Sequence, residues 1–126
     1  MAEGRGIEMM KKILVVDDDE SILEVVQIAL ESEGYHVQTI TNSRGLQKLT
    51  NDRPDLILLD MILGGEDGRI LCQRLKSNEE TRLIPVIILS AHSDAGQVAD
   101  TSGADDFLEK PFDIDALLDM VEKYCK

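Results

Sequence analysis

The feature that most constrains the fold of this chain is an alternation of two hydrophobic patterns. Short, continuous apolar runs alternate with longer segments in which apolar residues recur every three or four positions. A continuous run is typical of a strand that is covered on both faces, and the three-to-four spacing is typical of an amphipathic helix. We therefore expect an α/β fold, in which five parallel strands and five helices alternate strictly and the helices cover both faces of the sheet.

The predicted elements follow from the positions of these patterns. The predicted strands are residues 13–16, 37–40, 56–59, 86–89 and 106–108. The residues expected to face the core from the helices are Ile22, Val25, Val26, Ala29 and Leu30, then Leu46 and Leu49, then Ile70, Leu71 and Leu75, and finally Ile114, Leu117, Leu118 and Val121. Gly34 would end the first helix, while Ser43 and Asp113 would cap the second and the last. The helix around residues 95–101 has few apolar residues, so we expect it to be marginal and mobile.

Length, charge and cysteine content limit the class of protein. The 126 residues suffice for one domain, at residues 11–126, and residues 1–10 read as a flexible leader or an expression remnant. The net charge of −12 argues against direct binding to nucleic acid or to an anionic membrane. Cys72 lies in an apolar helical pattern and is expected to be buried. Because the chain has neither a membrane-spanning run nor a secretion signal, we expect a cytoplasmic protein.

Residues able to carry chemistry follow four of the predicted strands. Right-handed crossovers bring the carboxyl ends of parallel strands to one edge of the sheet, where ligands bind. The residues at these ends are Asp17, Asp18, Asp19 and Glu20 after the first strand, Asp60 after the third, Ser90 after the fourth and Lys110 after the fifth. Each alone has an ordinary structural explanation, such as a helix cap or a surface lysine. Their joint placement at four strand ends indicates a functional site.

Converging carboxylates favour a divalent cation and an anionic ligand. Like charges at close range repel, and Mg²⁺ or Mn²⁺ relieves the repulsion; the oxygen ligands that Mg²⁺ prefers are available from Asp18 and Asp60. Zinc is disfavoured, because His92 is the only nearby imidazole. Lys110, the Ser90 hydroxyl and the cation would together hold a phosphoryl group, and a carboxylate in line can accept it as an acyl phosphate. Asp60 is the candidate acceptor.

These residues resemble the receiver domain of two-component response regulators. The resemblance rests on Ile13–Asp19, on Leu56–Met61 with Asp67 and Gly68 downstream, on Ser90-Ala91 and on Lys110–Phe112. The segments occur in order and at family spacing over about residues 11–126. The resemblance implies a flavodoxin-like (CheY-like) fold, (βα)5, for a phosphoprotein that acts in phosphorelay signal transduction and catalyses only its own phosphorylation and dephosphorylation.

The resemblance also implies how the acceptor works. Asp60 would receive the phosphoryl group from a phosphohistidine of a sensor histidine kinase or a phosphotransfer protein. Asp18 and Asp60 would ligate Mg²⁺ through their side chains, Ile62 through its backbone carbonyl, and Asp17 largely through water.

The resemblance also implies a switch. Ser90 and Lys110 would bind phosphoryl oxygens, Phe107 would then rotate inward, and the bond between Lys110 and Pro111 would be cis. The surface of the fourth helix, fifth strand and fifth helix (the family's α4-β5-α5 surface) would change as a result. Through it the domain would signal to a downstream target or to an output domain that this sequence does not include, with or without phosphorylation-dependent dimerisation.

Two departures from the family pattern stand out. The loop after Asp60 reads Met61-Ile62-Leu63-Gly64-Gly65 where the family commonly has a proline four residues after the acceptor, so we expect a more flexible loop. Phe107 lacks the hydroxyl that many relatives carry, so its movement would act through burial alone.

Three alternatives stay open at this stage. A degenerate receiver would dock partners without being phosphorylated. A haloacid-dehalogenase-like phosphatase would use the loop Asp17–Ser21 with the acidic pair Asp105-Asp106, but it would leave Asp60 unexplained and needs a longer chain. An FMN-binding flavodoxin shares the architecture, but its phosphate would be repelled by the acidic loop after the first strand.

Overall fold

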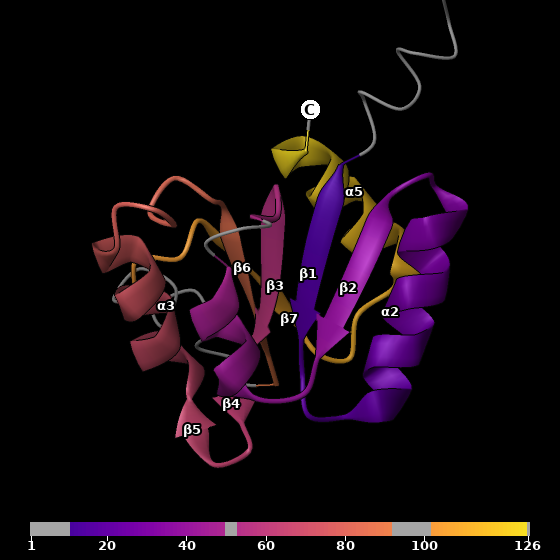
Figure 1. The fold of residues 1–126 in the computed structure, drawn as a ribbon. Helices are drawn as coiled ribbons and strands as arrows, with labels where there is room; N and C mark the ends of the chain where they lie inside the picture. Colours follow the sequence, from indigo (N-terminus) through magenta and orange to yellow (C-terminus); the bar gives the residue numbers. More distant parts are fainter. Residues whose placement is uncertain (1–10, 50–52, 92–101, 126) are drawn as a thin grey trace, which may run out of the picture.

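A parallel five-stranded sheet forms the centre of the molecule (Figure 1). The computed structural model of the chain describes residues 11–49, 53–91 and 102–125. The sheet strands are β1 (Lys12–Val16), β2 (His36–Ile40), β3 (Leu56–Asp60), β6 (Val86–Ser90) and β7 (Asp106–Glu109), in the order β2-β1-β3-β6-β7. All neighbouring strands pair in parallel. The predicted sheet is confirmed, and its order is that of the flavodoxin-like folds.

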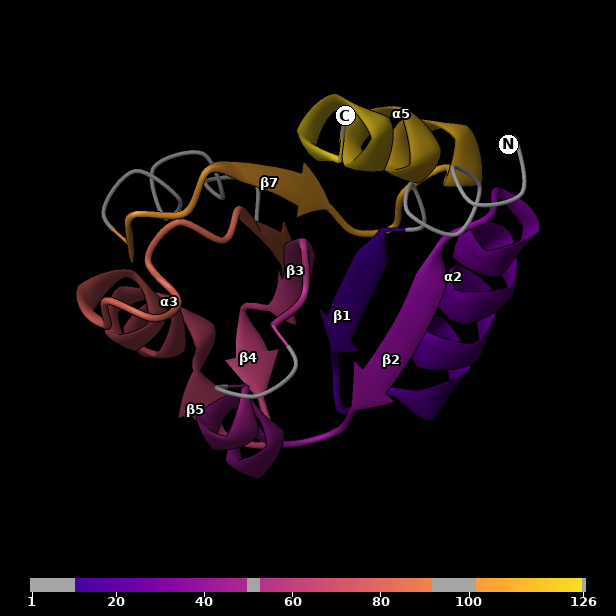
Figure 2. The ribbon, with the colours of Figure 1, turned by 45° about the horizontal axis from the view of Figure 1, so that its top comes forward.

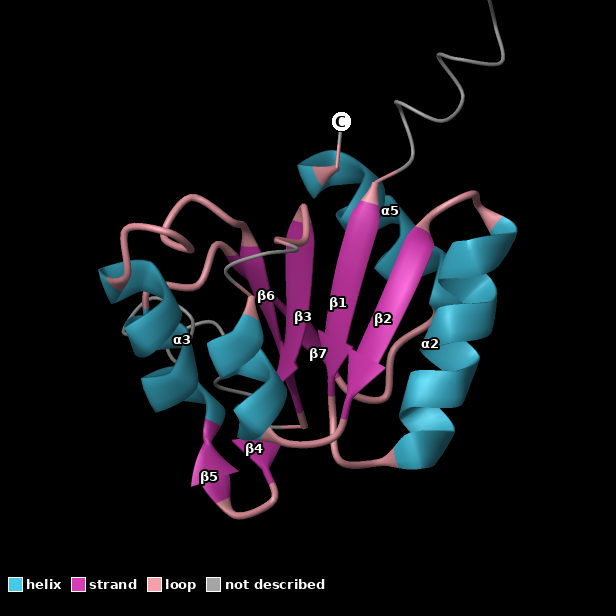
Figure 3. Ribbon diagram, in the orientation of Figure 1, coloured by secondary structure: helices cyan, strands magenta, loops and turns pink. Residues whose placement is uncertain are grey.

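Helices cover both faces of this sheet (Figure 3). They are α2 (Glu20–Ser32), the 3₁₀ helix η1 (Ser43–Lys48), α3 (Gly68–Ser77) and α5 (Ile114–Tyr124). Figure 2 shows α2 and α5 on one face and α3 on the other. The helix expected around residues 95–101 lies outside the described residues.

Two apolar clusters hold these layers together. Alternate strand residues point to opposite faces, so that Ile13 packs toward α2 and α5 while Leu14 packs toward η1 and α3. The helix residues buried in the first cluster are Leu23, Val26, Leu30, Leu117 and Val121. Those buried in the second are Leu46, Leu71, Cys72 and Leu75, and Leu49, which directly follows η1, is buried with them. Because both faces are covered, the central strands β1, β3 and β6 need continuous apolar runs, which is the pattern that the sequence shows there.

Two residues expected in the core are exposed. Val25 is 53% exposed and Ile70 is 47% exposed, so their predicted burial is wrong. An α-helix turns by about 100° per residue, and the face of α2 is set by Leu23 and Val26, which directs Val25 away from the sheet. In α3 the same geometry buries Cys72, as predicted, and turns Ile70 outward.

The helix starts differ in part from those expected. Asn42, and not Ser43, caps η1, since its Oδ1 accepts a hydrogen bond from the backbone N–H of Arg44 at 3.0 Å. Asp113 occupies the cap position of α5, but its side chain makes no capping hydrogen bond. Asp19 caps α2, where its Oδ1 accepts from the N–H of Ser21 at 2.9 Å.

The loop after β3 forms a small hairpin that the sequence analysis did not predict. Strands β4 (Ile62–Leu63) and β5 (Glu66–Asp67) pair antiparallel across a turn in which Gly64 and Gly65 have φ values of 55° and 86°. Two consecutive positive φ angles favour glycine and are typical of a tight hairpin turn. The two extra strands break the strict alternation, and their pairing opposes the flexibility expected of this loop.

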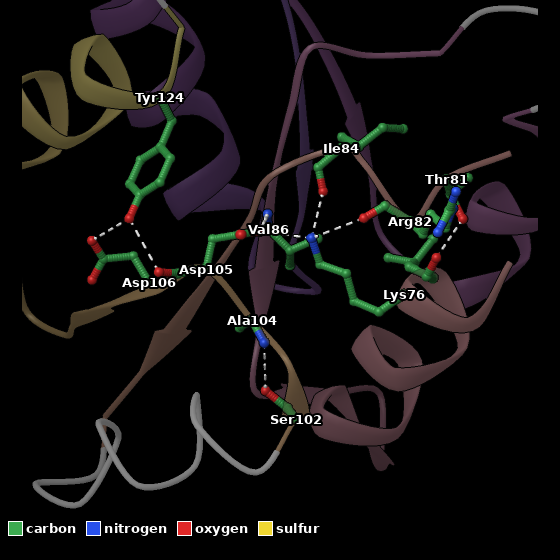
Figure 4. Close-up of polar contacts among 11 residues, drawn as sticks. Lys76, Thr81, Arg82, Ile84, Val86, Ser102, Ala104, Asp105, Asp106 and Tyr124 are labelled. Atoms are coloured by element: carbon green, nitrogen blue, oxygen red, sulfur yellow. Dashed lines mark hydrogen bonds and ion pairs between the residues drawn. The ribbon is translucent and has the colours of Figure 1, made fainter. Parts of the chain in front are cut away.

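A polar network closes the edge of the sheet where the strands begin (Figure 4). Lys76 Nζ lies 2.7 Å from Asp105 Oδ2, which also accepts a hydrogen bond from the backbone N–H of Val86 at 2.8 Å. The Tyr124 hydroxyl donates to Asp106 Oδ2 at 2.8 Å and also lies 3.1 Å from the Asp105 carbonyl oxygen. This network joins the ends of α3 and α5 to the starts of β6 and β7.

The first prediction concerns Tyr124 in this network. Burial, followed by the hydrogen bond and charge of Asp106 and the charge of Asp105, raises the pKa of Tyr124 to about 12. Unfolded tyrosine ionises near pH 10, so the folded state holds a proton that the unfolded state has lost, and stability should fall as the pH rises from about 10 to about 12. Absorbance titration of tyrosinate should show a transition near pH 12 that disappears in Tyr124→Phe. A Tyr124 transition near pH 10 in folded protein would contradict this account.

The second prediction concerns the close approach of α3 to the end of β3. The N–H of Gly68 donates to the Met61 carbonyl oxygen at 2.6 Å, and a Cβ on Gly68 would collide with the carbonyl oxygen of Asp60. Gly68→Ala should therefore lower the free energy of unfolding by about 1–3 kcal/mol, the usual cost of overpacking, as measured by urea denaturation. In the control Gly45→Ala, the three atoms nearest to the Cβ would all belong to the side chain of Ile40, and none to the backbone. Equal, small losses in both variants would refute the proposed collision.

Candidate functional site

The carboxyl edge of the sheet brings together the residues that the sequence analysis selected. Asp17 follows β1, Asp60 ends β3, Ser90 ends β6 and Lys110 follows β7. The register Asp60↔Leu89 and Ser90↔Glu109 places these ends side by side. Asp17 is 0% exposed and Asp60 is 9% exposed, so the site is set into the end of the sheet.

Lys110 bridges two of the carboxylates. Its Nζ lies 2.8 Å from Asp17 Oδ2 and 3.2 Å from Asp60 Oδ1. Its backbone N–H donates to the Ser90 carbonyl oxygen at 2.7 Å, and the peptide bond to Pro111 is cis. One residue therefore connects the carboxyl ends of β1, β3, β6 and β7.

The charges of this cluster act on each other strongly. Burial raises the pKa of Asp60, and the charge of Asp17 raises it further, while Lys110 and the backbone N–H of Ile62 oppose the increase. Burial alone would lower the pKa of Lys110, but its contacts with Asp17 and Asp60 outweigh that effect, so the pKa of Lys110 is raised and the ammonium form is favoured. The site thus holds a stable cation beside a carboxylate of increased basicity, which suits a nucleophilic oxygen.

The third carboxylate, Asp18, completes a group with the chemistry of a divalent-cation site. One oxygen from each of Asp17, Asp18 and Asp60 lies within 4.8 Å of the others. Asp18 is exposed, and its Oδ2 accepts a hydrogen bond from the N–H of Gly64 at 2.9 Å. With all three ionised, the single charge of Lys110 leaves two negative charges uncompensated. Oxygen donors with this excess charge fit a hard divalent cation such as Mg²⁺.

The Ser90 side chain has a partner that the sequence analysis missed. Ser90 is 1% exposed, and its Oγ lies 3.3 Å from the sulfur of Met61, which follows Asp60 directly. Side chains on neighbouring strands point the same way in register, and Met61 continues β3 beside Ser90 at the end of β6. The alternation of side chains along the two predicted strands was a sequence signal that could have identified the pair of Met61 and Ser90.

The remaining predicted residues occupy varied positions. Phe107 lies within β7, half-buried, and Pro111 is exposed. Ile62 lies in β4 with 53% of its surface exposed, and the role of its carbonyl as a ligand stays a prediction. Asp19 and Glu20 belong to the start of α2, where Asp19 acts as a cap. His92 lies outside the described residues.

The structure supports neither the phosphatase alternative nor the FMN-binding alternative. Asp105, which the phosphatase alternative would need beside Asp17, lies before β7 at the opposite edge of the sheet and contacts Lys76 there. The loop after β1 carries buried and exposed carboxylates toward the site, which disfavours the phosphate of FMN. The described helices are also all too short or too polar to cross a membrane.

Comparison with known proteins agrees with this geometry. Residues 13–122 match the family described as the response regulator receiver domain. The DNA-binding dual master transcriptional regulator RpaA of Synechocystis is 44% identical over 115 residues, which are 86% of this chain and 46% of RpaA. The sporulation initiation phosphotransferase F of Bacillus subtilis is 40% identical over 121 residues, covering 92% of this chain and 94% of that protein. The chain spans about half the length of several curated relatives.

A solved structure gives the same result. The receiver domain of the sensor histidine kinase PA1611 from Pseudomonas aeruginosa, described with a magnesium ion coordinated in its active site cleft, superposes with a TM-score of 0.82 at 26% identity. The match covers 92% of this chain and 98% of that one. Sheet order, acidic cluster and family match lead to one conclusion: this chain belongs to the response regulator receiver domains and is a phospho-accepting receiver of two-component signalling.

Proposed function

We propose that Asp60 is the phosphoacceptor and that the donor is a phosphohistidine of a sensor histidine kinase or phosphotransfer protein. The observation that carries this proposal is the bridge from Lys110 to Asp60 and Asp17 at the carboxyl edge of the sheet. A carboxylate oxygen of Asp60 would form a bond to phosphorus while the phosphorus–nitrogen bond to the histidine breaks. The released electron pair stays on the imidazole nitrogen, which then takes up a proton.

Asp17, Asp18 and Asp60, with the carbonyl oxygen of Ile62, would hold Mg²⁺ or Mn²⁺. The cation would offset the charge of the incoming phosphoryl oxygens, which is the main requirement of phosphoryl transfer. The two uncompensated charges of the cluster support this assignment, as does the magnesium ion in the receiver domain of PA1611.

Lys110 and Ser90 would hold the product. The Lys110 ammonium is already within 3.2 Å of Asp60 and can pair with a phosphoryl oxygen after transfer. The Ser90 hydroxyl would turn to another phosphoryl oxygen and draw its loop inward. Phe107 on β7 would then become more buried, which would change the surface of β7 and α5.

An apolar hollow beside the acceptor offers a place for the donor protein. Its volume is about 510 Å³, and it lies between α2 and the segment that leads into α5. Ile22, Val25 and Phe112 line it, next to Lys110. A donor helix packed against this hollow would bring its phosphohistidine to Asp60, and the exposure of Val25 would then have a functional reason.

The output of the domain is part of the same proposal. The charge of −12 disfavours direct contact of this domain with nucleic acid. Its phosphorylated form would instead act on a downstream target or on an output domain, and dimerisation of that form would be one route. A cytoplasmic location and catalysis of its own dephosphorylation belong to this proposal as well.

The third prediction tests the acceptor. Native protein that is incubated with acetyl phosphate and Mg²⁺ should gain the mass of one phosphoryl group, and Asp60→Asn should gain none. The control Asp119→Asn removes an exposed carboxyl of α5 and should behave as the native protein does. Chelation with EDTA should suppress the gain.

The outcomes separate the alternatives. No gain in the native protein, with Mg²⁺ binding confirmed by calorimetry, would establish a degenerate receiver. A gain that persists in Asp60→Asn would place the acceptor elsewhere and refute the proposal.

A further inference from the structure

We infer that Met61 is a positioning residue of the switch: its sulfur holds the Ser90 hydroxyl in the unphosphorylated protein and thereby sets how readily Ser90 turns to the phosphoryl group. This inference rests on the proposed phosphorylation of Asp60. Met61 is not among the site residues predicted from the sequence, and it does not belong to the acidic cluster.

The backbone holds Met61 firmly in place. Its N–H donates to the Leu89 carbonyl oxygen at 2.8 Å, and its own carbonyl oxygen accepts from the N–H of Gly68 at 2.6 Å. The side chain packs against the cluster between the sheet and α3. Hydrogen bonds on both sides therefore fix the backbone position from which the Met61 side chain extends. Its sulfur lies 3.3 Å from Ser90 Oγ.

The hydroxyl of Ser90 cannot serve both partners at once. A serine has one O–H donor, so donation to the Met61 sulfur and donation to a phosphoryl oxygen exclude each other. Sulfur is a weak acceptor, whereas a hydrogen bond to a charged oxygen is about twice as strong as a neutral one. The Met61 sulfur therefore orients the hydroxyl in the resting state and releases it at small cost when the phosphoryl group arrives.

This role predicts opposite effects for two substitutions. Met61→Leu keeps the volume but removes the acceptor, so the resting state loses a contact that the phosphorylated state does not use. Met61→Gln offers a carbonyl oxygen, a stronger acceptor, so the hydroxyl should be retained longer. If the Met61 side chain only filled space, the two substitutions would not change the rate of phosphorylation in opposite directions.

The fourth prediction measures these effects by intact mass. The initial rate of phosphoryl gain from acetyl phosphate and Mg²⁺ should rise about two- to five-fold in Met61→Leu, the factor that corresponds to the weaker end of the usual range for a hydrogen bond, and should fall in Met61→Gln. Met120→Leu, which alters a partly buried methionine of α5, should leave the rate unchanged. In a Ser90→Ala background, Met61→Leu should have no effect on the rate, because the hydroxyl is gone. The same increase in both backgrounds would overturn the inference.

A second measurement needs no phosphoryl donor. With ¹³C-labelled methionine methyl groups, the NMR signal of Met61 should move in Ser90→Ala, while the signal of Met120 should stay in place. An unmoved Met61 signal would refute the contact itself. If the Met61 signal moves in Ser90→Ala but the native protein gains no phosphoryl group, the contact exists and the proposed function is refuted. The switching role of Met61 would then be refuted as well.

Discussion

Both the fold and the site depend on the ion pairs that the Lys110 ammonium group forms with Asp17 and Asp60. Asp17 is wholly buried, and an unpaired carboxylate there would be strongly destabilising. Lys110, 93 positions later in the chain, supplies the compensating charge and reaches Asp60 with the same nitrogen. The contact that closes the sheet at this edge is therefore also the one that prepares the acceptor carboxylate.

The two edges of the sheet have different physical character. At the amino edge, Lys76, Asp105 and Tyr124 form short hydrogen bonds and an ion pair that tie two helices to two strands. At the carboxyl edge, the carboxylates exceed the described cations, and the buried hydroxyl of Ser90 points at a sulfur. The first edge holds the scaffold still, and the second has interactions that a phosphoryl group can replace with stronger ones.

Much of this could be predicted from the sequence, for physical reasons. Continuous apolar runs such as Leu56–Leu59 require a strand buried on both faces, and parallel topology then gathers the residues after each strand at one edge. Asp17, Asp60, Ser90 and Lys110 were found in this way. Val25 and Ile70 were misplaced because apolar content alone does not define which helix face meets the sheet.

Other features depended on neighbouring segments as well as on the local pattern. The hairpin of β4 and β5 arises from the positive φ angles of Gly64 and Gly65, where the sequence analysis considered only their flexibility. The cap of η1 moved by one residue, to Asn42, because the hydroxyl of Ser43 contacts Glu66 of that hairpin instead. Met61 was missed because its role depends on the strand beside it.

The most direct test of this account is to locate the phosphoryl group chemically. After phosphorylation with acetyl phosphate and Mg²⁺, borohydride reduction would convert an aspartyl phosphate to homoserine, and peptide mass spectrometry would identify the position. The account predicts homoserine at position 60 and at no other. Homoserine at position 17 or 18, or a phosphoryl group that resists reduction, would contradict it.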